Sequence, residues 1–166
     1  MYTGGSSPST VVKLRIKKYD VERVIIDPGR AANIMYYEAF QKLRFESEDL
    51  KLFFGTLVNF TNRETTPRSY VEAETVFGEG HNMTKAMLRY LVIECTSPYN
   101  VEIGLPAINN IGAVVSPMHL EMKYPTPYGN IGVLAGEQKV ANSCVSECEE
   151  RYVKWGPRAA QEGNKV

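Results

Sequence analysis

From residue 11 to residue 17 the sequence alternates between apolar and basic side chains (VVKLRIK). Successive side chains of a β-strand point to opposite faces, so this period of two predicts a strand with one buried face. Further apolar runs predict strands at 21–26, 56–58, 70–77, 83–93, 114–115 and 120–124, with a turn at 19–20. Helical spacing is found at 34–43 and at 106–111, where a proline suits the first helical turn. The sequence therefore predicts a mostly β fold with one or two short helices.

The length of 166 residues suits a single domain. Residues 1–10 consist largely of glycine, serine, threonine and proline, which predicts a flexible lead-in. After Pro125 the chain becomes polar, contains glycine and finally mixes its charges, which is typical of a linker or tail. We therefore expect one folded domain at 11–124, followed by a polar linker or tail at 125–166.

Charge and hydropathy exclude several classes of partner. Nineteen Lys and Arg residues balance nineteen Asp and Glu residues, so there is no net charge to attract nucleic acid or an acidic membrane. No apolar run approaches the ~18 residues of a membrane span, and residues 1–10 lack the features of a signal peptide. We expect an intracellular, cytoplasmic protein that is not secreted and contacts neither nucleic acid nor membrane directly.

Metal and disulfide chemistry have little support in the sequence. The three cysteines, Cys95, Cys144 and Cys148, are an odd number, and no histidine lies near the last two. His81 and His119 lie far apart in the chain. We expect reduced thiols and neither a metal nor another cofactor.

A carboxylate stands where an apolar strand ends abruptly. Residues 24–26 (VII) lead directly into Asp27-Pro28-Gly29, in which the proline removes a backbone donor and stops strand pairing. Asp, Pro and Gly in this order are also common in ordinary β-turns, so the tripeptide alone is compatible with a simple turn. A second apolar-glycine unit, Ile103-Gly104, follows downstream.

Together these segments resemble the retropepsin-like aspartic protease domain of plant gypsy-type LTR-retrotransposon gag-pol polyproteins. The resemblance covers about residues 11–140. It rests on an ordered series of segments: VIIDPG (24–29), ANIMYY (32–37), GTLVNF (55–60), YVEAETVFG (70–78), SPYN (97–100), PAIN (106–109), GAVVS (112–116), KYPT (123–126) and GEQKVA (136–141). It implies a small closed β-barrel, with the catalytic aspartate on a turn and a flap hairpin that closes over an extended peptide.

The resemblance also implies an aspartic endopeptidase with Asp27 as its catalytic residue. Such chemistry needs two adjacent carboxylates that share one proton. Of the aspartates Asp20, Asp27 and Asp49, only Asp27 has a glycine two residues later, so one chain supplies one catalytic carboxylate. We therefore expect a homodimer that cleaves extended segments of its own polyprotein.

Other site residues follow from the same resemblance. Pro28, Gly29 and Arg30 would complete the active-site turn, with Ile103 and Gly104 supporting it. The flap tip would comprise Asn59, Phe60, Thr61 and Asn62, which would bind substrate through backbone hydrogen bonds.

Several residues depart from the family pattern and leave alternatives open. Pro28 replaces a threonine or serine, Arg30 a serine or alanine, Glu102 an apolar residue and Leu105 an arginine. Arg30 would favour two ionised carboxylates, and Glu102 would be costly to bury without a partner unless it faces solvent. The alternatives are an inactive dimerisation or peptide-binding module from a decayed element, or a small β-domain in which residues 27–29 form only a turn.

Overall fold

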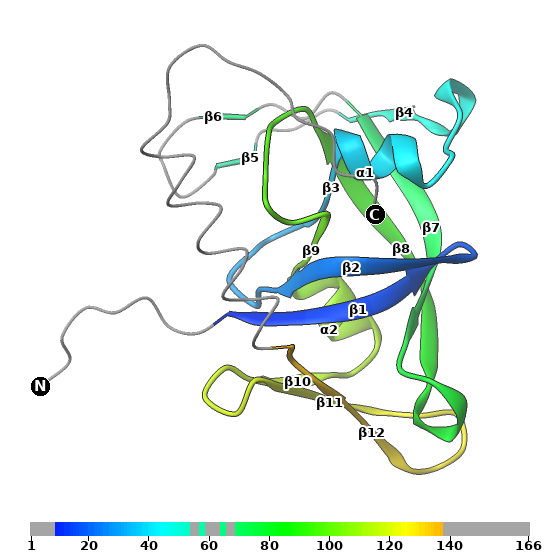
Figure 1. Ribbon diagram of the computed structural model, residues 1–166, viewed down its shortest axis with the longest axis vertical. Helices are drawn as coiled ribbons and strands as arrows, with labels where there is room; N and C mark the ends of the chain where they lie inside the picture. Colours follow the sequence, from blue (N-terminus) through cyan, green and yellow to red (C-terminus); the bar gives the residue numbers. More distant parts are fainter. Residues whose placement is uncertain (1–8, 54–56, 59–63, 66–68, 138–166) are drawn as a thin grey trace, which may run out of the picture.

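Strands close into a barrel in the computed structural model, which describes residues 9–53, 57–58, 64–65 and 69–137 (Figure 1). Around the barrel their order is β1 (Thr10–Ile16), β2 (Tyr19–Ile26), β9 (Val101–Ile103), β3 (Asn33–Tyr36), β8 (Thr84–Ile93) and β7 (Ser69–Phe77). β7 also pairs with β1, which closes the ring of six strands. The predicted closed β-barrel is confirmed.

The first hairpin follows the predicted alternation closely. In β1 the apolar residues are buried, whereas Lys13 and Arg15 are exposed. The turn lies at residues 17–18, where Lys17 has a φ of 57°, and not at the expected 19–20, which belong to β2. The register of the β1–β2 pair shifts between Val12 and Leu14, because β2 contains an extra residue there. This bulge in β2 lies near Arg23, whose φ is 54°.

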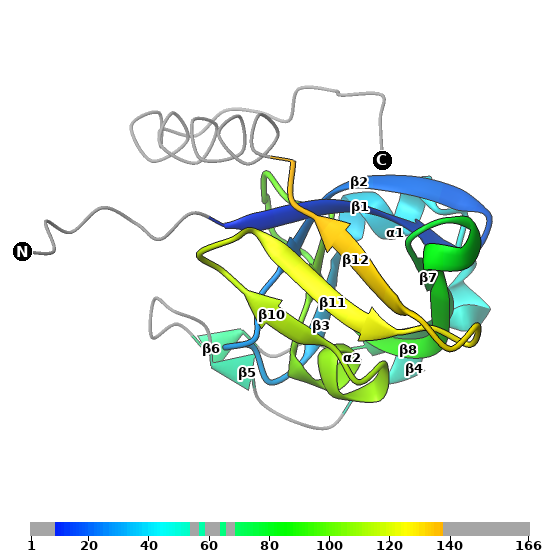
Figure 2. The same ribbon diagram turned by 90° about the horizontal axis from the view of Figure 1, so that it is seen from below.

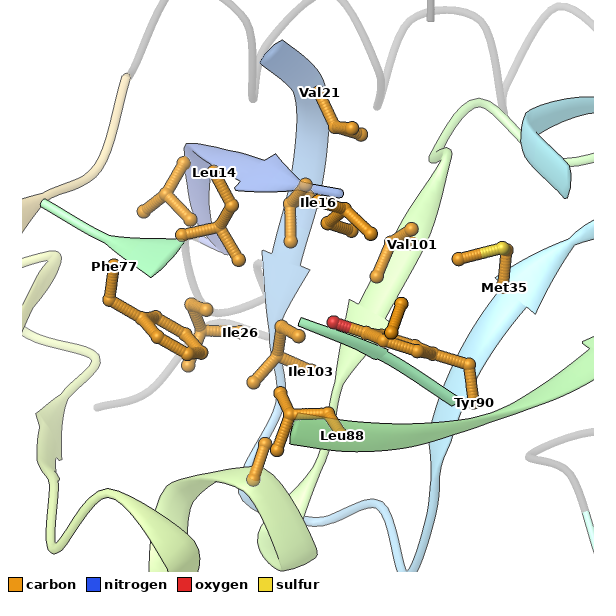
Figure 3. Packing of buried hydrophobic residues seen from close by; sticks show 14 of the residues in the cluster. Leu14, Ile16, Val21, Ile26, Met35, Phe77, Leu88, Tyr90, Val101 and Ile103 are labelled. Carbon is orange, nitrogen blue, oxygen red and sulfur yellow. The ribbon is translucent and has the colours of Figure 1, made fainter. Parts of the chain in front are cut away.

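The core occupies the inside of the barrel. Figure 3 shows Ile16 of β1, Leu88 of β8 and the β9 residues Val101 and Ile103 converging in this core. Tyr90 is fully buried beside them, and its hydroxyl lies 2.6 Å from the Thr75 hydroxyl. This hydrogen bond satisfies the one polar atom that the tyrosine side chain brings into the core.

The segment predicted as one helix at 34–43 instead forms a strand followed by a helix. β3 lies between β8 and β9, pairing in parallel with β8 and antiparallel with β9, and α1 (Tyr37–Lys42) begins directly after it. Burial of Ile34 and Met35 between two neighbouring strands outweighs the local helical spacing. The second predicted helix is confirmed as α2 (Leu105–Asn110), with proline in its first turn.

A three-stranded sheet below the barrel corrects the predicted boundary at residue 125. It comprises β10 (Val114–Ser116), β11 (Glu121–Pro125) and β12 (Ile131–Ala135) (Figures 1 and 2). β12 pairs along the whole of β11, and the backbone N–H of Glu137 donates to the Val11 carbonyl, 2.6 Å away. Residues 126–137 are therefore folded against the barrel despite their polar composition.

The remaining elements are short. They are η1 (Ser47–Asp49), η2 (Gly80–Asn82), β4 (Lys51–Leu52), which pairs with β7, and β5 (Leu57–Val58), which pairs antiparallel with β6 (Glu64–Thr65). The predicted flap tip, the lead-in at 1–8 and the tail beyond 137 lie outside the described residues. None of the helices in the described part of the chain is long and apolar enough to span a membrane.

Candidate active site

Asp27 lies where two parallel strands end side by side. β2 and β9 pair in parallel up to Ile26 and Ile103, and the Asp27 N–H donates to the Ile103 carbonyl, 2.8 Å away. The aspartate is thereby attached to the barrel by its own backbone. Its side chain is 22% exposed, so the carboxylate sits at the barrel surface and can be reached.

The turn after Asp27 is closed by hydrogen bonds to that residue. The Gly29 N–H donates to Asp27 Oδ1 at 2.9 Å, and the Arg30 N–H donates to the Asp27 carbonyl at 3.2 Å. Pro28, which has no N–H to donate, lies between Asp27 and Gly29. The carboxylate is therefore oriented by its own turn, with the Gly29 amide as donor.

Gly104 fits tightly beneath this turn. Its N–H donates to Asn33 Oδ1 at 2.9 Å, and the next residue, Leu105, donates its N–H to the Arg30 carbonyl at 2.8 Å. A Cβ at Gly104 would overlap the Ala32 carbonyl oxygen and lie 2.9 Å from the Arg30 carbonyl oxygen. Only glycine allows the two segments to approach so closely.

Asn33 joins the strands under the turn, a role that sequence reasoning did not assign. Its side chain is buried, accepts from Gly104 and donates through Nδ2 to the Arg89 carbonyl at 3.1 Å. It therefore links β3 to β8 and to the end of β9. A polar residue directly before the buried pair Ile34-Met35 was the available signal.

Arg30 turns back between two carboxylates. Its Nε lies 3.7 Å from Asp27 Oδ2 and 3.5 Å from Glu102 Oε2. The side chains of Arg30 and Glu102 are only 14% and 7% exposed, so Glu102 does not face solvent. The buried carboxylate predicted to be costly without a partner has one in Arg30.

Burial and neighbouring groups act in opposite directions on the pKa of the Glu102 carboxyl. Burial raises the pKa of this carboxyl above its ordinary value and is the largest influence on it. The Arg30 guanidinium and the hydrogen bond with Tyr36 lower that pKa, whereas the Asp27 carboxylate raises it. Burial, followed by the charge of Glu102, also raises the pKa of the Tyr36 hydroxyl.

Comparison with known proteins identifies the fold. No family model and no curated protein matches the sequence. Among solved structures, a retropepsin-like aspartic protease from Rickettsia conorii covers 64% of this chain and 74% of its own, with a TM-score of 0.44 and 14% identity. The retroviral protease-like domain of Ddi1 from Leishmania major covers 81% of this chain and 95% of its own, with a TM-score of 0.52 and 12% identity. The chain has the retropepsin-like fold.

Within this retropepsin-like fold the structure brings most of the predicted site residues together. The Asp27 turn (residues 27–30) is bonded to Ile103 through the Asp27 N–H, and Gly104 lies close to the Arg30 carbonyl. Asn59, Phe60, Thr61 and Asn62 lie outside the described residues, in the segment between β5 and β6. No group of three His, Cys, Asp or Glu side chains that could hold a metal occurs in the described ranges.

A groove of about 560 Å³ begins immediately after the turn. Its lining is mostly apolar with a few polar groups, and comprises Ala31, Ala32, Asn33, Phe53, Glu72, Met87, Leu88, Arg89, Leu91, Pro106 and Asn110. Asp27 is not among the lining residues; the groove lining begins at Ala31, four residues further along the chain. A mostly apolar lining with a few polar groups suits a peptide side chain.

The raised pKa of Glu102 predicts a specific pH dependence of stability. The folded state holds the Glu102 proton more tightly than the unfolded state does. Protonation of Glu102 therefore adds most to the free energy of unfolding at low pH, and this stabilisation is lost as pH rises from about 4.5 through the folded pKa. The loss is about 1.4 kcal/mol for each unit between the two pKa values. Urea unfolding between pH values of about 4 and 8 should show this decline in the unsubstituted chain and not in Glu102→Gln. Equal slopes in the two proteins would contradict it.

Proposed function

We propose that this chain is an aspartic endopeptidase domain that acts as a homodimer. The observation that carries the proposal is the placement of Asp27, at the end of paired strands in a retropepsin-like barrel, on a turn that orients its carboxylate. The partial exposure of that carboxylate leaves it able to meet a second copy and a substrate. The Asp27 turn is the part of the molecule that supports hydrolysis.

The proposed chemistry uses Asp27 of each protomer. Two carboxylates held about 3 Å apart retain one proton between them, because both cannot ionise at that distance. The ionised carboxylate takes a proton from water, which attacks the peptide carbonyl carbon, while the protonated carboxyl donates to the carbonyl oxygen. Collapse of the tetrahedral intermediate breaks the C–N bond as a proton passes to the leaving amine.

The proposed substrate is an extended peptide segment of the polyprotein that contains this domain. The apolar groove beside the Asp27 turn could accept one of its side chains. The β5–β6 hairpin occupies the sequence position of the expected flap, which would hold the peptide backbone. The plant gypsy-type origin of the polyprotein is supported by the resemblance of the sequence segments, from VIIDPG to GEQKVA.

Dimer formation should make cleavage depend steeply on protein concentration. Below the dimer dissociation constant, the rate should rise with the square of the protein concentration, because only the dimer holds both carboxylates. The assay is cleavage of a mixed peptide pool at about pH 5, where such a pair keeps one proton. Sedimentation over the same concentrations provides the dimer fraction.

The outcomes distinguish the homodimeric protease from the inactive dimerisation or peptide-binding module. A rate that follows the dimer fraction supports the homodimeric protease. A rate proportional to total protein, with sedimentation showing monomer, would contradict the shared site. A dimer that cleaves no peptide would indicate the inactive dimerisation or peptide-binding module.

A further inference from the structure

We propose that Glu102 is a positioning residue for the Asp27 turn: its buried carboxylate holds the Arg30 guanidinium beside Asp27 and offsets the guanidinium's charge there. The catalytic consequence rests on the proposed protease function. The structural part of the inference rests only on the contacts among these three side chains.

The backbone holds both members of the pair in place. Glu102 is the central residue of β9, paired with Ile25 of β2 on one side and with Ile34 of β3 on the other. Arg30 is attached through its N–H to the Asp27 carbonyl and through its own carbonyl to the Leu105 N–H. The backbones of Glu102 and Arg30 are therefore both fixed, that of Glu102 within the barrel and that of Arg30 on the Asp27 turn.

Charge balance explains why the two residues belong together. With all three groups ionised, Asp27, Arg30 and Glu102 carry a net charge of −1, from one guanidinium and two carboxylates. Removing Glu102 alone gives 0, and removing Arg30 alone gives −2. Removing both Arg30 and Glu102 leaves −1. The double substitution therefore keeps the net charge of the cluster, which each single substitution changes.

The other titratable neighbours contribute no charge at weakly acidic pH. Tyr36 approaches Glu102 from β3, and Cys95 approaches from the segment after β8. The pKa of Tyr36 is raised, chiefly by burial, and so is that of the Cys95 thiol, so both stay neutral. In the described part of one chain, Arg30 and Glu102 thus decide which charge Asp27 meets.

Arg30 without Glu102 would work against catalysis. A buried guanidinium 3.7 Å from Asp27 places a positive charge beside the carboxylate pair of the proposed dimer, which must keep one proton. With Glu102 on its other side, the same guanidinium divides its interaction between two carboxylates. Arg30 and Glu102, which both depart from the family pattern, are therefore a matched pair in which the charge of one offsets that of the other.

The test combines a double-mutant cycle with titration of Glu102. Stability of Arg30→Ala, Glu102→Gln and the double variant is measured by urea unfolding at neutral pH. We expect Arg30→Ala to destabilise the unsubstituted chain, which keeps a buried carboxylate at position 102, clearly more than it destabilises Glu102→Gln. Arg15 and Asp20, an exposed pair 3.6 Å apart at the far end of the β1–β2 hairpin, provide the matched control (Arg15→Ala, Asp20→Asn), which should be nearly additive.

Titration of the Glu102 carboxyl by carbon NMR tests the link to Asp27 without any activity assay. We expect Arg30→Ala to raise the pKa of Glu102 and Asp27→Asn to lower it. In the cleavage assay, Glu102→Gln should move the pH profile to lower pH by about one unit, a tenfold change in proton affinity. The double variant should return the profile towards that of the unsubstituted chain.

Each result bears on one part of the inference. An additive cycle like that of the control, or a Glu102 titration unaffected by Asp27→Asn, would overturn it. A non-additive cycle with an unchanged pH profile of cleavage would show that Glu102 has a purely structural role, and would also overturn the inference. If the unsubstituted dimer cleaves nothing, the proposed protease function fails, while the cycle and the titration still decide whether Glu102 holds Arg30 against Asp27.

Discussion

Replacing Asp27 by asparagine is expected to lower the rate of peptide cleavage by about a thousandfold or more. The asparagine amide can neither accept a proton from water nor hold the shared proton, and the dimer loses both carboxylates at once. The side chain keeps its shape, and its oxygen can still accept the Gly29 N–H bond. The measurement is kcat/KM on a peptide found in the pool assay, with thermal unfolding to show that the fold is retained.

Asp20→Asn is the control for this experiment. Asp20 is exposed on the β1–β2 hairpin and paired only with Arg15 among the described ion pairs, so cleavage should be unchanged. Cleavage that survives in Asp27→Asn would show that another group, or a contaminating protease, performs the reaction. Equal inactivity of the unsubstituted chain and the variant, with dimers present, would favour the peptide-binding module.

Replacing Gly104 by alanine is expected to lower the free energy of unfolding by about 3 kcal/mol, with loss of cleavage. The added methyl group would meet the carbonyl oxygens of Ala32 and Arg30, which are backbone atoms and cannot rotate away. Relief would require the Asp27 turn to separate from the end of β9, which breaks the bonds of Gly104 to Asn33 and of Leu105 to Arg30. Urea unfolding and the cleavage assay measure the two effects.

Gly80→Ala separates this steric effect from the ordinary cost of losing a glycine. Gly80 has a φ of 56°, but a Cβ there meets nothing within 4 Å. The expected cost is about 1 kcal/mol, from backbone strain alone, with cleavage retained. Similar losses in the two variants would mean that the close approach at Gly104 does not hold the turn.

The pairing of Arg30 with Glu102 changes how the departures from the family pattern should be tested. Restoring a small residue at position 30 alone would leave Glu102 buried without its guanidinium partner. An attempt to increase activity should therefore change both positions together. Pro28 is accommodated, because the hydrogen bond to the Asp27 carboxylate comes from Gly29.

Local patterns were sufficient for most strands and for the position of Asp27. The alternation in β1, the apolar end of β2 and the long runs of β7 and β8 depend on which side chains face the core, and a period of two records that directly. The abrupt change from VII to Asp-Pro-Gly likewise placed the turn. These features are properties of consecutive residues and need no knowledge of distant contacts.

Tertiary structure decided the features that depend on distant partners. Residues 33–36 form a strand because β8 and β9 lie on either side of them, and β12 forms because β11 offers it a full edge. Asn33, polar in an apolar stretch, is buried because it bonds two other strands. By itself the sequence determined a mostly β chain with a single aspartate suited to the turn. Only the fold, by holding Glu102 between β2 and β3 and facing it towards Arg30, decided the charge that this aspartate meets.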